Sequence, residues 1–392
     1  MAKLKISTEE LIKEAGALAS INNPDVSMLQ NNLKLLVGAI NSEADLREVV
    51  IPMVSHSLAQ SLRNRLEVEQ WVRDYPEIRN EVIEQPIFLT GLPRSGTTYF
   101  QYLFDPEPSM RMLRYWEGER PCPPPGFAPE TISGRIEWCA QERASAQQKD
   151  SVRAKLAQIH LSDADGPEEC LKLIDQTFLN VGHYWTFRVP SYFNACLDEQ
   201  ALLQAYEYHK LALQLLQWRS NKQRWVLKWP CHLVALEQIL QVHPEARFVV
   251  THRDPVQALA SNCSLASLLR RGTSNHVDPH EVGNQMLDML LAYLERLVAF
   301  DEKHGDRMAH VAYQTAVEQP EIAMEQALTA LGIPMSTSFA EAIQSWRRDN
   351  PPGKRGTHDY ALEDYGLDAD EMKERFAFYI NRYDIPSERE SL

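Results

Sequence analysis

A glycine-rich turn between an apolar run and a helical pattern is the feature that most restricts how this chain can fold. Residues 86–90 read PIFLT, and residues 91–98 read GLPRSGTT. Glycines at Gly91 and Gly96 let the backbone curl so that several N–H groups point at one anion, and the N-terminus of a following helix adds partial positive charge. We therefore expect a buried parallel strand over 86–90, a phosphate-binding turn, and a helix from Thr97 to about Leu103.

Strands and helices alternate in the second half of the chain. Apolar runs at 224–228 and 246–251 and a shorter one at 310–313 predict strands. Helical patterns separate or follow them, at 198–220, 232–242, 255–270, 281–303 and 320–331. Alternation of this kind is typical of an α/β fold with a central parallel sheet, flanking helices and right-handed crossovers.

Residues 8–80 lack strand patterns, since Leu11, Ala15 and Leu18, and later Leu33, Leu36 and Val37, recur at helical spacing. We expect an N-terminal helical extension over residues 1–80, packed on a main domain over 81–392. Five prolines within 121–129 exclude a helix or central strand there, whereas residues 131–160 again have a helical pattern.

The formal net charge of -14 argues against nucleic acid as a partner, because phosphate backbones need basic surface. The sequence contains no run of 18 or more apolar residues, so it predicts no membrane-spanning helix. The N-terminal residues lead into a charged helical pattern, and the six cysteines are spread widely without zinc spacing. We expect reduced thiols, no metal and a cytoplasmic protein, and the sequence leaves a homo-oligomer open.

The turn at 91–98 differs from that of nucleoside triphosphatases. Those proteins need Lys directly after the second glycine, and this chain has Thr97 and Thr98 there. Its cation is Arg94, inside the turn, and no clear apolar strand ends in an Asp that would hold Mg²⁺. A sulfuryl group carries less negative charge than a terminal phosphoryl group, so Arg, Lys and N–H groups can support its transfer without a metal.

A second anion site follows the strand at 246–251. Arg253 lies just after that strand, and Ser261 lies eight residues later on the predicted helix. Because open α/β sheets bind ligands at the carboxyl ends of their strands, this pair is placed to grip a phosphate.

Four separated pieces together resemble the family of sulfotransferases that use 3'-phosphoadenosine 5'-phosphosulfate (PAPS), in particular its bacterial branch. In that resemblance the loop Arg94, Ser95, Gly96, Thr97 and Thr98 holds the 5'-phosphosulfate, and Arg253 with Ser261 binds the 3'-phosphate. Tyr313 corresponds to the residue beside the adenine, and Lys354, Arg355 and Gly356 correspond to a late basic loop on the 3'-phosphate. The resemblance covers roughly residues 85–380. It implies a P-loop-like α/β fold, PAPS as co-substrate, and a small-molecule acceptor.

The resemblance and the chemistry of displacement suggest catalytic roles. Lys228, at a strand end, resembles the lysine that stabilises the leaving phosphate, and Arg94 assists it. The histidine that the cytosolic branch has nearby is missing, because Trp229 and Pro230 stand in its place. Glu117 resembles the glutamate used as base in other branches, where the base removes the acceptor's proton as it reacts. His160, Glu168, Glu169 and His232 are alternative bases.

The aromatic segment 178–193 and the prolines of 121–129 suggest an apolar acceptor pocket with a mobile rim. Lipid, sterol or phenol alcohols fit such a pocket, and carbohydrate, peptide and amine acceptors stay open. Two other classes are alternatives. A P-loop small-molecule kinase should need Mg²⁺ and the missing loop lysine, and a non-catalytic nucleotide-binding module would keep Arg253 and Ser261 without a base.

Overall fold

One parallel β-sheet forms the centre of the computed structural model, which describes residues 5–149, 152, 154–155, 163–221, 223–350 and 361–388. The strand order is β2-β3-β1-β4-β5, with every neighbouring pair parallel. The α/β fold expected from the sequence is confirmed. The strands are β1 (Ile87–Gly91), β2 (Met110–Met112), β3 (Arg224–Lys228), β4 (Arg247–His252) and β5 (Met308–Ala312).

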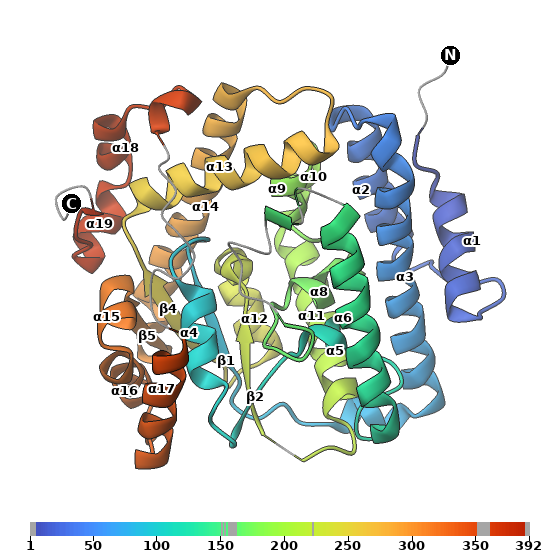
Figure 1. Ribbon diagram of the computed structural model, residues 1–392, viewed down its shortest axis with the longest axis horizontal. Helices are drawn as coiled ribbons and strands as arrows, with labels where there is room; N and C mark the ends of the chain where they lie inside the picture. Colours follow the sequence, from blue (N-terminus) through green and yellow to red (C-terminus); the bar gives the residue numbers. More distant parts are fainter. Residues whose placement is uncertain are drawn as a thin grey trace.

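The sheet is buried on both faces, as the unbroken apolar run of β1 predicts. All five residues of β1 are buried. Phe88 packs into one hydrophobic cluster, and its neighbours Ile87 and Leu89 pack into the other, because successive side chains of a strand point to opposite faces. Helices therefore cover both faces (Figure 1). Those that follow the strands are α4 (Thr97–Phe104), η5 (Pro230–Ala235), α12 (Leu236–Val242), α13 (Pro255–Thr273), α14 (Pro279–His304), η6 (Gly305–Arg307), α15 (Tyr313–Glu318) and α16 (Pro320–Ala330).

The N-terminal region is helical, as expected for residues 8–80, and its helices lie together at one side of the molecule (Figure 1). Leu33, Leu62 and Leu66 from this region are buried in the same hydrophobic cluster as Phe88. The boundary near residue 80 stays a prediction, since this shared core does not mark it. The elements are α1 (Thr8–Ala19), α2 (Gln30–Glu43), η1 (Glu48–Val50), α3 (Ile51–Asp74) and η2 (Pro76–Asn80).

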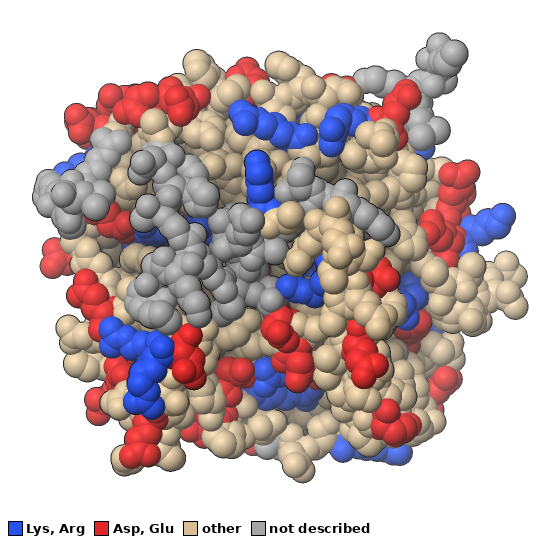
Figure 2. Space-filling view, viewed as in Figure 1, with Lys and Arg blue, Asp and Glu red and all other residues tan. Residues whose placement is uncertain are grey.

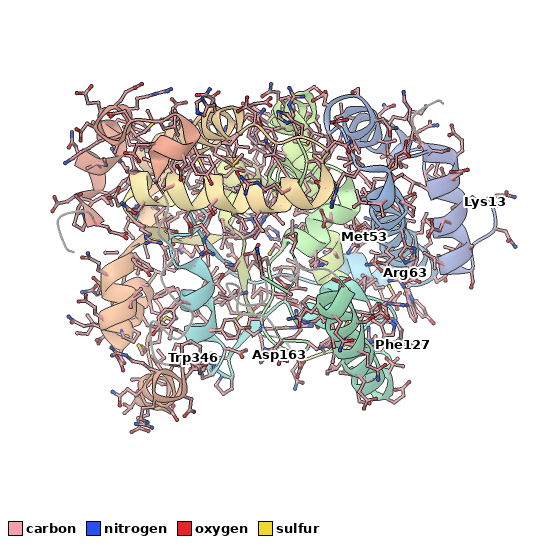
Figure 3. All side chains as sticks on the ribbon, turned by 45° about the horizontal axis from the view of Figure 1, so that its top comes forward. Lys13, Met53, Arg63, Phe127, Asp163 and Trp346 are labelled. Atoms are coloured by element: carbon pink, nitrogen blue, oxygen red, sulfur yellow. The ribbon has the colours of Figure 1, made fainter. Side chains whose placement is uncertain are left out.

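A long helical excursion connects β2 to β3. The proline-rich stretch within it has no helix or strand until Pro129, and the Cys122–Pro123 peptide bond is cis. Phe127 stacks on Trp218 with ring centroids 5.7 Å apart, so this stretch is fixed to the helical side of the molecule (Figure 3). The described elements are α5 (Tyr115–Glu119), η3 (Pro129–Thr131), α6 (Ile132–Lys149), α8 (Leu171–Ile174), η4 (Asp175–Thr177), α9 (His183–Thr186), α10 (Pro190–Cys196) and α11 (Glu199–Gln217).

The C-terminal region adds helices that the sequence analysis did not assign. Trp346 fastens the first of them to α4, because its ring lies 5.4 Å from that of Tyr99 and 6.0 Å from that of Tyr102 (Figure 3). Asp and Glu side chains gather over the helices that follow it in the chain, at the upper left of Figure 2. The elements are α17 (Thr337–Asp349), η7 (Leu362–Tyr365), α18 (Ala369–Arg375) and α19 (Ala377–Tyr383).

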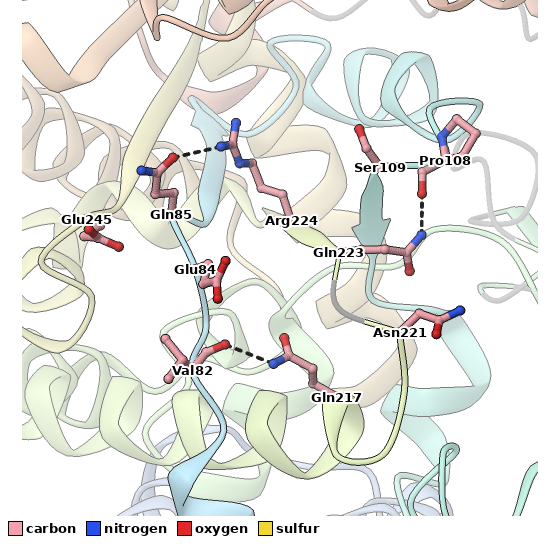
Figure 4. A pocket seen from close by; sticks show the side chains of 10 residues that line it. All are labelled: Val82, Glu84, Gln85, Pro108, Ser109, Gln217, Asn221, Gln223, Arg224 and Glu245. Atoms are coloured by element: carbon pink, nitrogen blue, oxygen red, sulfur yellow. Dashed lines mark hydrogen bonds between the residues drawn. The ribbon is translucent and has the colours of Figure 1, made fainter.

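Two further findings concern membrane crossing and a cavity away from the motif residues. None of the helices in the described ranges combines the length and apolar character that crossing a membrane needs. A polar cavity of about 650 Å³ opens at the amino ends of β1 and β3, where Arg224 donates to Gln85 at 2.8 Å (Figure 4). The motif residues lie at the opposite, carboxyl edge of the sheet, so this cavity is separate from them.

Candidate active site

The turn predicted to bind phosphate joins the central strand β1 to α4. Gly91 has φ +147° and Gly96 has φ +86°, both in the range that favours glycine. A Cβ at Gly91 would lie 2.4 Å from the backbone oxygen of Thr251, its partner on β4. Only glycine therefore lets β1 and β4 pair to the edge of the sheet.

Hydrogen bonds hold the turn against the neighbouring strand and helix. The Ser95 and Thr251 hydroxyls lie 2.7 Å apart, and the buried Asn262 amide donates to the Pro93 carbonyl at 3.0 Å. Ser95 and Thr97 are buried. Gly96 is the N-cap of α4 and offers no side chain to the first-turn N–H groups, so the helix N-terminus can accept an anion.

Three residues predicted for the second phosphate and the adenine, Arg253, Ser261 and Tyr313, converge beside the turn and Arg94. Arg94 Nε donates to Ser261 Oγ at 3.1 Å, and Arg253 Nη1 donates to the Arg94 carbonyl at 2.8 Å. The Arg253 guanidinium lies over the Tyr313 ring, 4.6 Å from its centroid. A Cβ at Gly96 would lie 2.6 Å from Tyr313 Cδ2, so that ring rests directly on the turn.

Arg253 has a further partner that sequence reasoning missed. Glu388, beyond α19, binds one edge of the guanidinium at two points: Nε–Oε1 and Nη2–Oε2 are each 2.7 Å. The Glu388 backbone N–H also donates to Asp254 Oδ2 at 3.0 Å. Burial acts to lower the pKa of Arg253, but the hydrogen bonds and charge of Glu388 outweigh it and raise that pKa. No local pattern marks Glu388, since the contact spans 135 residues.

Lys228 ends β3 and is only 1% exposed. Its ammonium donates to Thr98 Oγ1 on α4 at 2.8 Å and forms an ion pair with Glu169. The Cys170 N–H donates to the Lys228 carbonyl at 2.9 Å, so the segment carrying Glu169 runs along the end of β3. The lysine is thereby brought to the phosphate turn, with a carboxylate beside it.

Glu117 occupies a different setting, at the start of α5. One oxygen accepts from the Arg114 N–H at 3.0 Å, as part of a capping box, and the other forms an ion pair with Arg111. The residue is 2% exposed. One carboxylate oxygen thus caps the helix, and the other ties the helix to β2.

The other candidate bases are placed as follows. Glu168 is buried and accepts from the Glu169 N–H at 2.8 Å. His232 is fully buried beside Phe88, with ring centroids 5.1 Å apart, and burial holds its pKa well below the usual value. His160 lies outside the described residues, as do Lys354, Arg355 and Gly356 of the predicted basic loop.

The aromatic residues expected to line an acceptor pocket are mostly core residues. Phe178 and Tyr192 are fully buried, and Tyr192 Oη accepts from the Asn180 N–H at 2.8 Å. They pack into the cluster that also holds Phe88. The described part of this segment therefore stabilises the fold and gives no support to its role as a pocket wall.

Comparison with known proteins decides the family. The model of the sulfotransferase family matches residues 86–337, more than half of the chain. The chain belongs to the sulfotransferase family. It is therefore a transferase enzyme that moves sulfuryl groups, and the matched range contains the phosphate turn, Lys228, Arg253 and Tyr313.

Two solved sulfotransferases are similar over nearly their whole length. The sulfotransferase STF9 from Mycobacterium avium is 27% identical with a TM-score of 0.89, and the match covers 99% of both chains. The sulfotransferase STF1 from Mycobacterium tuberculosis is 27% identical with a TM-score of 0.83, over 96% of this chain and 100% of the other. No curated protein matches the sequence. The expected likeness to bacterial sulfotransferases is confirmed.

Proposed function

We propose that this sulfotransferase moves the sulfuryl group of PAPS to a hydroxyl or amine of a small-molecule acceptor, without a metal. The observation that carries the proposal is the convergence of two anion positions at one edge of the sheet. One is the turn at 91–98 with Lys228, and the other is formed by Arg253 and Ser261. PAPS carries a phosphosulfate and a separate 3'-phosphate, which match two such positions.

The residues present fit this donor. The glycine turn and the N-terminus of α4 would hold the 5'-phosphosulfate. Arg253, a planar fork at the end of β4, would bind the 3'-phosphate with Ser261, and the Tyr313 ring would lie beside the adenine. All six cysteines are unpaired, which supports the cytoplasmic location expected from the sequence.

In the proposed step the acceptor oxygen forms a bond to sulfur while the bond from sulfur to the 5'-phosphate oxygen breaks. The electron pair of that bond leaves with the nucleotide, and the acceptor's proton goes to a carboxylate. Lys228 and Arg94 would neutralise charge on the sulfuryl group and the leaving phosphate.

The contacts favour Glu169 over Glu117 as the proton acceptor. Glu169 lies beside Lys228 at the end of β3, and its side chain is 16% exposed. In the proposed step Lys228 turns to the donor and the Glu169 carboxylate takes the proton. Both oxygens of Glu117 are used in the capping box and in the ion pair with Arg111.

The proposal is tested by transfer of labelled sulfuryl from PAPS to a panel of phenols, alcohols and amines, with Mg²⁺ and with EDTA. Lys228→Ala should lose at least about a hundredfold in turnover, equivalent to about 2.7 kcal/mol. Lys303→Ala is the matched control, because Lys303 pairs with Glu237 at the surface and is 64% exposed. Strict dependence on ATP and Mg²⁺, or unchanged turnover in Lys228→Ala, would refute the proposal.

A further inference from the structure

Arg253, which we propose binds the donor's 3'-phosphate, is already paired with a carboxylate of the protein itself. Glu388 grips Arg253 at two points, through Nε and Nη2. These two donors form an edge of the guanidinium that a phosphate can also bind, because carboxylates and phosphates share the same two-point geometry on arginine. Both partners are mostly buried, with side chains 23% and 22% exposed.

Glu388 is held there by more than its charge. Its backbone N–H donates to Asp254 Oδ2, and Asp254 also caps α13 by accepting from the Val256 N–H at 2.9 Å. Residues 383–386 line a cavity of about 210 Å³ together with Arg253, Tyr313 and Glu388. The described residues beyond α19 thus run along the carboxyl ends of β4 and β5, and Glu388 reaches the proposed nucleotide site.

The remaining contacts of Arg253 restrict how a phosphate can approach it. Nη1 donates to the Arg94 carbonyl in the phosphate turn, and one face of the guanidinium covers the Tyr313 ring. A phosphate that binds Arg253 at Nε and Nη2 must take the position of the Glu388 carboxylate.

We propose that Glu388 is an internal competitor of the donor's 3'-phosphate, so that donor binding releases the segment at 384–388 from Arg253. This inference rests on the proposed function and deepens it. In the free enzyme Glu388 keeps Arg253 paired and oriented. The entering 3'-phosphate takes over the fork, and the affinity for the nucleotide is reduced by the cost of breaking the internal pair.

The experiment measures binding of adenosine 3',5'-bisphosphate and of adenosine 5'-monophosphate to the full chain by calorimetry. Glu388→Gln should bind the bisphosphate roughly tenfold more tightly, equivalent to about 1.4 kcal/mol. The monophosphate has no 3'-phosphate to compete with Glu388, so its affinity should stay within about twofold. Glu374→Gln removes the same charge from the exposed face of α18 and should change neither affinity.

Each alternative outcome overturns the inference in a distinct way. Weaker bisphosphate binding by Glu388→Gln would mean that Glu388 only positions Arg253. Equal gains for both nucleotides would mean a general effect of charge, and unchanged affinities would mean no competition. If neither the wild type nor Glu388→Gln binds the bisphosphate, the proposed function fails and the inference falls with it.

Hydrogen exchange supplies a second readout that does not depend on a variant. The bisphosphate should slow exchange in residues 92–99 and accelerate it at Glu388, whose N–H loses its bond to Asp254. A ligand that merely stabilises the protein would slow exchange in both places. Slower exchange at Glu388 in the complex would refute the release.

Discussion

The contact between Gly96 and Tyr313 joins the phosphate turn to the proposed adenine site, and replacing Gly96 by Ala tests it. Gly96 has φ +86°, a left-handed conformation that costs alanine about 1–2 kcal/mol. The new Cβ would lie 2.6 Å from Tyr313 Cδ2, whereas carbon atoms prefer about 3.5–4.0 Å. The ring must therefore move by about 1 Å, and overpacking of this kind costs about 1–3 kcal/mol.

We expect Gly96→Ala to lower the free energy of unfolding by about 2–5 kcal/mol, the sum of the two costs. Displacement of the ring should also weaken binding of adenosine 3',5'-bisphosphate by roughly tenfold, because Arg253 rests on that ring. Urea unfolding and calorimetry measure the two quantities. Gly38→Ala is the control, since an added Cβ there meets nothing within 4 Å, and it should stabilise α2 by about 0.5–1 kcal/mol.

A double-mutant cycle separates the clash from the backbone strain. Tyr313→Ala removes the ring that the Gly96→Ala Cβ would strike. The double variant should therefore be less destabilised than the sum of the single variants by about 1–3 kcal/mol. Additive losses in stability would show that the ring contact contributes nothing, and the reasoning would be refuted. Wild-type nucleotide affinity in Gly96→Ala would refute the link to the donor site.

Three other measurements test separate parts of the structure. Burial lowers the pKa values of His209, His243 and His252 to about 3. Histidines in the unfolded chain titrate near pH 6.5, so the free energy of unfolding should be full above that pH and fall as the pH drops, by about 2 kcal/mol per residue at pH 5. Urea unfolding at pH 7.5 and pH 5 measures this loss. Equal free energies of unfolding at the two pH values would contradict it. Glu169→Gln should reduce turnover in protein that is still folded, whereas Glu117→Gln should keep turnover and lower the free energy of unfolding by about 1–3 kcal/mol through loss of the buried ion pair; a loss of turnover in Glu117→Gln and none in Glu169→Gln would make Glu117 the base. Trp346 is partly buried, so Trp346→Ala should destabilise the protein by about 1–3 kcal/mol, less than loss of a core tryptophan, and loosen α17 from α4, which melting curves and proteolysis would reveal; an unchanged melting temperature would contradict that packing.

The central sheet could be predicted because its signals are local. The strand expected at 224–228 is found as β3 at those residues, and the turn at 91–98 lies between a strand and a helix as predicted. Differences elsewhere are small and have local causes. The helix expected over 232–242 begins as the 3-10 helix η5, and the strand expected at 310–313 ends at Ala312, because Tyr313 opens α15.

Some short or C-terminal elements were not predicted from the sequence, and the reasons can be identified. The edge strand β2 has only three residues, Met110–Met112, too few to show a period of two. The helix α17 did carry a signal that could have been used, since Ser336 accepts from the Phe339 N–H as an N-cap. Asp368 caps α18 in the same way.

The contacts within the site were beyond sequence reasoning because they join distant positions. The ion pair of Lys228 with Glu169 spans 59 residues, and that of Arg253 with Glu388 spans 135. The motif gave Arg253 and Lys228 as cations that face a ligand, but it said nothing about which carboxylates balance them. Buried or half-buried cations need such partners, and only the fold determines which acidic residues reach them.

Arg253 connects the end of β4, the phosphate turn through the Arg94 carbonyl, the ring of Tyr313, and the segment that carries Glu388. Its removal would leave Glu388 without its counter-ion and free the turn, so a loss of nucleotide binding in Arg253→Ala could come from the fold alone. Substituting Glu388 instead keeps the cation and takes away only its internal partner. A gain of affinity in that variant cannot be produced by unfolding, and for that reason it is the more decisive test of how the enzyme recognises its donor.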